Sequence, residues 1–284
     1  MAAALKRRLD ALVASFDASS IDPDPLGIVR GYRGPDDLEV AGILCAGLAI
    51  GGVQVILRSA RTALAALGPR PAEGLAGATD RHLRRAYRGF RHRWVDGDDL
   101  AAFLSAVRRV RESRGSLRDA FLAGDTGGEA IEGGMEALAG ALRAADPGFA
   151  RRGAAAFVPA PSGGSACKRP ALFLRWMVRD DGIDTGAWKE VDPARLVLPL
   201  DTHLERFSRG LGLLHRRTPD WKAALEATAG FRRLSPSDPL RYDFALCRLG
   251  ILDLCPPGHS GRCRAGRVHG VCERGLVPSA TSPA

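Results

Sequence analysis

The chain has 284 residues, of which 45% are hydrophobic and 26% are charged, so it can bury one large core or two smaller ones as a globular protein. Its formal net charge of +9 and pI of about 9.8 suit a polyanionic partner. The chain is also rich in Ala, Gly and Arg, a bias that coding composition explains equally well. Charge alone therefore leaves nucleic-acid binding open.

The first sixteen residues carry a helical pattern. Leu5, Leu9, Leu12 and Phe16 fall on one helix face, while the charged residues 6–8 and 10 interrupt any apolar run. This pattern excludes a signal peptide and a membrane span at this end. We therefore expect a cytoplasmic protein, and we expect its six cysteines to be reduced thiols rather than disulfides.

Helical spacing continues through the first half. The apolar stretch 38–67 predicts two helices joined near Gly51 and Gly52. The run 81–94 (RHLRRAYRGFRHRW) is interpreted as a solvated helix face followed by a buried aromatic cluster. Asp98 and Asp99 are candidate N-caps of the next helix. Further helices are predicted over 100–110, 116–122 and 130–145, before a loop over 147–164.

The second half gives four more helices, predicted over 167–178, 202–211, 221–234 and 239–252, with a polar connector between the first two. No segment alternates as a strand. The predicted fold class is therefore all-α, with two packed helical lobes over residues 1–252. Residues 253–284 form a tail rich in Cys, Pro, Gly and Arg without periodicity.

Only four of the 41 basic residues are lysines, at positions 6, 168, 189 and 222. A guanidinium stays protonated, whereas an amine can lose its proton and attack carbon. Lys168 follows the glycine-rich segment Ser162–Cys167 at a predicted helix start. A lysine at that place, in a chain that otherwise uses arginine, points to nucleophilic chemistry.

The glycine-rich segment is a candidate anion site. Gly163, Gly164 and Ser165 let the backbone approach a phosphate closely, and the positive end of the following helix attracts it. That same positive end favours the neutral amine of Lys168. Arg169 follows directly and is a further candidate DNA contact.

Asp201 is the predicted N-cap of the helix that begins at Thr202. As a carboxylate it could orient or deprotonate an amine, or stabilise an oxocarbenium-like sugar centre. Beside it, His203 could bind a phosphate or satisfy a core carbonyl. Trp176 and Trp188 could stack on an extruded base, although the helical stripe around Trp176 favours core packing.

The order Gly-Gly-x-x-x-Lys followed by Pro-Leu-Asp-Thr-His-Leu resembles the helix-hairpin-helix (HhH-GPD-like) DNA glycosylase superfamily over about residues 22–252. The long separation of Lys168 from Asp201 is similar to the archaeal 8-oxoguanine DNA glycosylase branch. The Ser-Ala-Cys-Lys-Arg and Leu-Asp-Thr-His blocks look like those of a bacterial family of uncharacterised proteins. Residues 43–61 resemble the early barrel helix whose following turn enters the duplex, and residues 242–250 resemble the late barrel helix.

The resemblance implies a two-lobed base-excision enzyme of the cytoplasm and nucleoid, monomeric, acting on double-stranded DNA that contains a damaged base. It implies that the hairpin binds backbone phosphate and that Lys168 attacks C1′ of a flipped nucleotide, giving a Schiff base and AP-lyase activity without a cofactor. An oxidised purine such as 8-oxoguanine is the expected lesion. Because Pro170 lies close behind Lys168, the helix must begin near residues 165–167. The alternative is a non-catalytic duplex or damage binder that retains the fold.

Cys255, Cys263 and Cys272 look like the iron–sulfur loop of some endonuclease III relatives, but Gly266 stands where a further cysteine is expected. Zinc held by three cysteines and one histidine is chemically allowed. An eroded loop without metal is the remaining interpretation, and a metal-dependent protein or RNA adaptor is a third function class.

Overall fold

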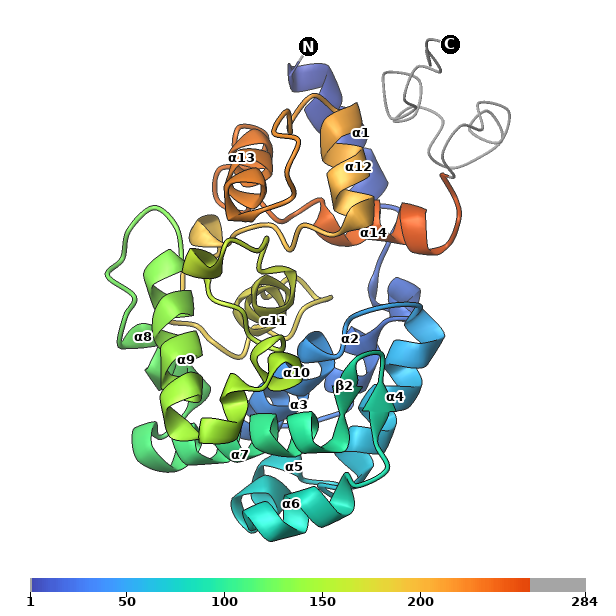
Figure 1. The fold of residues 1–284 in the computed structure, drawn as a ribbon. Coiled ribbons are helices and arrows are strands. Elements are labelled where there is room, and N and C mark those ends of the chain that lie inside the picture. The colour runs from blue at the N-terminus through green and yellow to red at the C-terminus, as the bar shows by residue number, and fades with distance from the viewer. Residues whose placement is uncertain (1, 256–284) are drawn as a thin grey trace, which may run out of the picture.

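The computed structural model describes residues 2–255, and its architecture is almost wholly helical (Figure 1). The longer helices are α1 (Ala2–Val13), α3 (Pro35–Gly47), α4 (Val53–Ala65), α7 (Gly97–Arg114), α9 (Glu132–Ala145), α11 (Lys168–Val178), α12 (Thr202–Gly210), α13 (Trp221–Arg232) and α14 (Asp243–Ile251). The shorter ones are α2 (Pro25–Val29), α5 (Pro71–Ala76), α6 (Asp80–Ala86), α8 (Leu117–Leu122) and α10 (Arg152–Ala155). Four 3-10 turns are η1 (Ala18–Ile21), η2 (Pro147–Ala150), η3 (Pro161–Gly163) and η4 (Pro193–Arg195). The all-α prediction is confirmed at the level of fold class.

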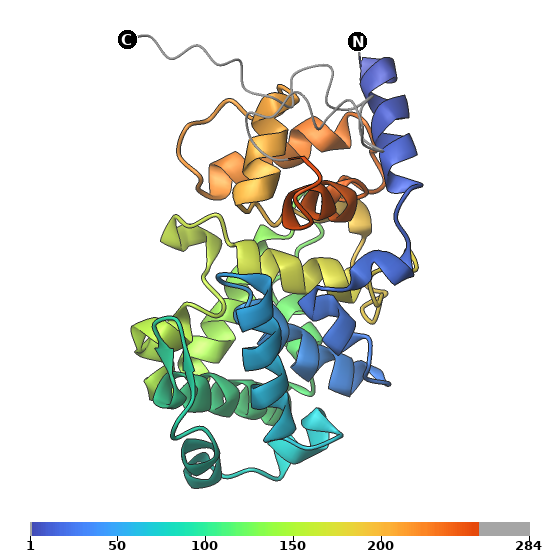
Figure 2. The same ribbon diagram turned by 90° about the vertical axis from the view of Figure 1, so that its right-hand side faces the viewer.

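Two groups of helices lie one above the other, with α11 at their junction. Helices α1, α12, α13 and α14 form the upper group, and most of the chain before α11 forms the lower one (Figures 1 and 2). Helix α11 packs on α3, where Gly42 permits a close approach: a Cβ there would lie 2.8 Å from Met177 Cε. No helix within residues 2–255 is long and apolar enough to cross a bilayer.

The arginine-rich run contains a small hairpin that the sequence analysis missed. Strands β1 (Arg91–His92) and β2 (Val95–Asp96) pair antiparallel. Between them, Arg93 adopts a left-handed φ of 57°, and Trp94 is 49% exposed at the tip. Tyr87 is buried, as predicted. The prediction of a buried aromatic cluster is wrong for Trp94, because the turn directs its ring away from the core.

The start of α7 and the predicted loop over 147–164 both differ from the expectation. The N-cap of α7 is Asp96, not Asp98 or Asp99, because the Asp96 carboxylate accepts the Asp99 N–H at 2.9 Å. The Asp99 carboxylate in turn accepts the Asp96 N–H at 3.1 Å, which completes a capping box. The expected loop over 147–164 contains η2, α10 and η3.

The connector between α11 and α12 is polar in sequence, as predicted, but part of it is buried. Trp188 is buried there, with its ring 5.8 Å from that of Phe121 and 5.2 Å from that of Phe173. Aromatic packing against α8 and α11 therefore holds the connector inside the fold. Trp176 is also fully buried, so neither tryptophan is available to stack on a base, and this corrects the role considered for Trp188.

A buried network of ion pairs joins α11 to the upper helices. Arg175 contacts Asp184 at 3.1 Å and Asp243, on α14, at 2.8 Å. One turn later, Arg179 contacts Asp184 at 2.6 Å and Asp238 at 2.8 Å. The side chains of Arg175, Asp184 and Asp243 are almost wholly removed from solvent, so each charge depends on its partners.

We predict that Arg175→Met lowers the free energy of unfolding by about 3–5 kcal/mol, because it leaves buried carboxylates without their shared partner. Lys189→Met is the matched control. Lys189 pairs with Asp180 at 2.5 Å on the exposed surface, where such a pair contributes about 0–1 kcal/mol. Urea denaturation measures both variants. Equal losses for the two would contradict a stabilising role for the network.

Candidate active site

Two helix N-termini meet where the lobes join. Lys168 is the first residue of α11 and Asp201 is the N-cap of α12. Lys168 Nζ lies 3.7 Å from Asp201 Oδ2 and donates to the carbonyl of Ala49 at 3.3 Å. The Lys168 side chain is 33% exposed and that of Asp201 is 17% exposed. The amine is thus held beside a carboxylate at a position that a ligand can reach.

The carboxylate of Asp201 is held by its own helix. Its Oδ1 accepts the backbone N–H groups of His203 at 3.0 Å and Leu204 at 2.8 Å, which confirms the predicted N-cap. Oδ2 is the oxygen nearer to Lys168. One oxygen therefore fixes the side chain while the other contacts the amine.

The turn before Lys168 uses two left-handed residues. Gly164 has a φ of 76° and Cys167 a φ of 51°, and Cys167 caps α11. The helix start matches the one that Pro170 requires, because this proline falls in the first turn, where its missing N–H costs nothing. The Cys167 N–H is held by Ser165 Oγ at 3.2 Å.

The backbone N–H groups available to a phosphate in this turn differ from those that the sequence predicts. The N–H groups of Gly163 and Gly164 bond to the carbonyls of Ala160 and Pro161, so these glycines shape the turn instead of offering donors. Within this turn, the N–H groups that have no acceptor among the described residues are those of Ser165, Ala166, Lys168 and Arg169. These four donors lie at the start of an eleven-residue helix. They form a better candidate anion site than the N–H groups of the two glycines.

The element before this turn is not a long helix. It consists of η3 and, earlier, the four-residue α10. Glu136 of α9 braces it by accepting the Ser162 N–H at 2.6 Å and the Ser162 hydroxyl at 3.1 Å. Short turns braced by α9 therefore stand where the resemblance implies the first helix of a helix-hairpin-helix.

Arg169 and His203 are less open than a direct DNA contact requires. Nη1 of Arg169 is buried without a hydrogen-bond partner in residues 2–255, and burial lowers the pKa of this guanidinium to about 10. The Arg169 charge also helps to lower the pKa of the buried His92, after the larger effect of burial. His203 packs on α14, where a Cβ at Gly250 would lie 2.2 Å from its Nδ1, which supports its structural role.

Asp243 is a site residue that sequence reasoning missed. It is buried on α14, near enough to Asp201 for the two charges to interact, and its Oδ2 has no hydrogen-bond partner among the described residues. Burial raises the pKa of Asp243 to about 6, with Arg175 opposing the shift and Asp201 adding to it. Cys247, one turn later, donates to Asp243 Oδ1 at 3.5 Å. Their i, i+4 spacing was the only available signal, and it is also that of an ordinary helix face.

The rim of the site includes two loops. The turn between α3 and α4 holds Ala49, whose carbonyl contacts Lys168, and Gly51, whose φ is 98°. A Cβ on Gly51 would lie 3.5 Å from Arg93 Cδ, so the hairpin tip adjoins this turn. Trp94 at the tip and Val55 on α4 are among the few large apolar side chains exposed within residues 2–255.

The structure describes only one of the three tail cysteines. Cys255 is buried, whereas Cys263 and Cys272 lie outside the described residues. In residues 2–255 no group of three or more His, Cys, Asp or Glu side chains is arranged to hold a metal ion. No disulfide links Cys45, Cys167, Cys247 and Cys255.

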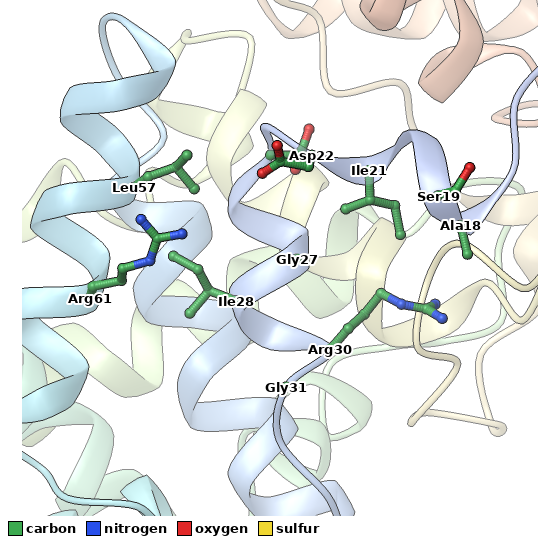
Figure 3. Close-up of a pocket in the computed structure, with 11 residues that line it drawn as sticks. Ala18, Ser19, Ile21, Asp22, Gly27, Ile28, Arg30, Gly31, Leu57 and Arg61 are labelled. Atoms are coloured by element: carbon green, nitrogen blue, oxygen red, sulfur yellow. The ribbon is translucent and has the colours of Figure 1, made fainter.

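A separate hollow of about 560 Å³ lies between η1, α2 and α4 (Figure 3). Its charged lining residues include Asp22, Arg30 and Arg61, and it contains neither Lys168 nor Asp201. Nη1 of Arg30 donates a hydrogen bond to the carbonyl oxygen of Ile183 at 2.6 Å. The hollow is thus distinct from the Lys168 site.

A family model described as a protein of unknown function, DUF2400, matches residues 24–252, a span that holds both Lys168 and Asp201. Neither the curated proteins nor the solved structures gave a match. The family match thus covers the candidate site but carries no description of its activity.

We predict that Asp243→Asn flattens part of the pH dependence of stability. The folded-state pKa of Asp243, about 6, lies above its ordinary value of 3.8, so the native state binds the extra proton in this window. The wild type therefore loses stability relative to the variant as pH rises from about 4 to about 6, by up to about 2–3 kcal/mol. Urea denaturation across this range measures the difference. A constant difference between the two proteins would contradict the raised pKa of this buried carboxyl.

Proposed function

We propose that this chain, which belongs to the DUF2400 family, is a DNA base-excision glycosylase with AP-lyase activity that uses Lys168 as its nucleophile. The observation that carries the proposal is the 3.7 Å approach of Lys168 Nζ to Asp201 Oδ2, at two helix N-termini that meet in a partly exposed site. An amine beside a fixed carboxylate is suited to proton removal followed by attack on carbon.

In the proposed reaction, Asp201 accepts a proton from the Lys168 ammonium or stabilises positive charge on the sugar. The Lys168 lone pair forms a bond to C1′, and the electrons of the N-glycosidic bond leave with the base, which takes up a proton. Opening of the sugar ring gives a Schiff base between Nζ and C1′. Loss of a C2′ proton then expels the 3′ phosphate, which is the lyase step.

The backbone donors at the start of α11 suit a DNA phosphate. The N–H groups of Ser165, Ala166, Lys168 and Arg169 lie at the positive end of this helix. A phosphate bound there would place the adjoining sugar near Lys168 Nζ. The turn at Gly51 and the exposed Trp94 flank this position and suit insertion into a distorted duplex.

The proposed substrate is double-stranded DNA with a damaged base, and the resemblance of the Lys168 and Asp201 segments favours an oxidised purine such as 8-oxoguanine. We propose a cytoplasmic, nucleoid-associated monomer. The lysine chemistry requires no cofactor. An iron–sulfur cluster or zinc at Cys255, Cys263 and Cys272 stays a separate proposal, which metal analysis of the purified full chain would test.

The second candidate is a non-catalytic duplex or damage binder that retains the fold. The contacts of Lys168 favour it in one respect, because those with Ala49 and Asp201 also tie α11 to the turn after α3 and to α12. A lysine that only braces these elements would make the same contacts. Covalent trapping distinguishes the two functions.

We predict that borohydride reduces the Schiff base and links the wild-type protein covalently to an 8-oxoguanine duplex. Lys168→Gln should abolish trapping, and Asp201→Asn should slow it by about 100-fold or more, the scale of a general acid–base contribution. Lys189→Gln replaces an exposed lysine that pairs with Asp180; it serves as the matched control and should trap normally. Absence of any adduct from folded wild type, on a panel of oxidised, alkylated and abasic duplexes, would sink the enzymatic proposal.

We also predict that Trp94→Ala weakens lesion-duplex binding by about tenfold, because one stacking contact of a base on an aromatic ring is worth about 1–3 kcal/mol. The half-exposed ring makes little contribution to the core, so the thermal midpoint should hardly change. Trp94→Phe is the conservative control and should retain most of the affinity. Fluorescence anisotropy measures binding, and equal affinity of the alanine variant and wild type would remove Trp94 from the interface.

A further inference from the structure

A line of arginines leads away from the site along the lower lobe. Arg81, Arg84, Arg85 and Arg88 lie on α6 and the turn after it, and Arg91 and Arg93 lie on the hairpin; all six are exposed. We call this set the arginine ridge. Residues 81–95 contain no Asp or Glu. From the sequence alone, this run is interpreted as a solvated helix face. The proposed reaction does not use the ridge.

The ridge forms one surface because the inner sides of both its segments, α6 and the hairpin, are attached to α4. Helical spacing places Arg81, Arg85 and Arg88 on one side of α6 and the buried Leu83 and Tyr87 on the other. The Tyr87 hydroxyl donates to the carbonyl of Ala63 on α4 at 2.9 Å.

The hairpin is anchored to the same helix. His92 points inward, with Nδ1 2.9 Å from the hydroxyl of Ser59 on α4, so the neighbouring Arg91 and Arg93 point outward. Exposed Arg58 and Arg61 extend the basic surface onto α4 itself. The rigid attachment presents these charges as one array.

The ridge differs from the other arginine clusters of this chain in lacking acidic partners. On α7, Arg108 pairs with Asp80 at 2.9 Å and Arg111 pairs with Glu39 at 2.5 Å. No ridge arginine forms an ion pair with any other residue in 2–255. Like charges spaced three or four residues apart on a helix repel each other. A bound polyanion would relieve this repulsion.

We infer that the arginine ridge docks the phosphate backbone of duplex DNA on one side of the proposed lesion site. Guanidinium groups bind phosphate in bidentate fashion, and the ridge ends at Arg93, beside the Gly51 turn that adjoins Lys168 through Ala49. The continuity with the site favours DNA. A membrane surface fits poorly, because α6 carries no exposed large apolar residue to enter lipid, and Trp94, at the end of the ridge, is the only one in residues 81–95.

This inference rests on the proposed function, and its test is chosen to be independent of catalysis. The variant Arg85→Gln/Arg88→Gln/Arg91→Gln removes three ridge charges; Arg84 is left in place because it lines a hollow together with Asp98. The matched control, Arg114→Gln/Arg143→Gln/Arg217→Gln, removes three exposed arginines that lie elsewhere and have no ion pair within the described chain. The affinity of each full-length protein for a lesion-free DNA duplex is measured as a function of salt.

We expect the ridge variant to bind about 10- to 100-fold more weakly at physiological salt, with the slope of log K against log salt reduced by about 2–3. The control should change neither quantity beyond a small effect of net charge, and both variants should keep the wild-type thermal midpoint. With saturating lesion duplex, the ridge variant should still give the wild-type yield of covalent adduct.

Equal losses in the ridge variant and its control would overturn the inference, since they would report net charge alone. A variant that binds the DNA duplex normally but loses affinity for an RNA duplex of the same sequence would also overturn it. Failure of trapping in all proteins, with the ridge effect on DNA intact, would refute the glycosylase and leave the DNA-docking surface standing.

Discussion

The buried pairing of Arg175 with Asp184 and Asp243 is the constraint on which the site depends. It fixes α11, which carries Lys168 at its start, against α14 of the upper helices. Helix α14 packs closely on α12, and Asp201 begins α12. The separation of amine and carboxylate is therefore set through the core, rather than by a flexible loop between them. Replacing one partner alone would leave a buried charge unpaired and would destabilise the fold.

Electrostatics at the site combines two opposing influences. The helix starts at Lys168 and Asp201 present positive ends, which attract negatively charged groups. Below them, the carboxyl of Asp243 adds negative potential whenever it is ionised, and burial raises its pKa to about 6. A base-excision reaction needs an amine that can lose its proton and a carboxylate that remains nearby. Lys168 and Asp201 are the two groups that the proposed reaction uses. The buried ion pairs of Arg175 with Asp184 and Asp243 contribute to the electrostatic potential around them.

The sequence allowed the helices and the two principal residues to be predicted because their signals are local. Period-3.6 apolar spacing located most helices, and the N-cap character of Asp201 depends only on the next three residues. The role of Asp243 could not be predicted in this way, because its burial and its pairing with Arg175 arise from residues far apart in the chain. The same holds for Trp188, buried by contact with Phe121 and Phe173, and for the exposed Trp94, whose position depends on the left-handed turn at Arg93.

The most direct test of the central claim is mass-spectrometric mapping of the borohydride-reduced protein–DNA adduct. Only four lysines are present, so the modified peptide identifies the nucleophile without ambiguity. The account predicts that the deoxyribose remnant is attached to Lys168, in the peptide that begins α11. Attachment to Lys6, Lys189, Lys222 or the terminal amine would contradict it, because the nucleophile would then not be the lysine that contacts Asp201.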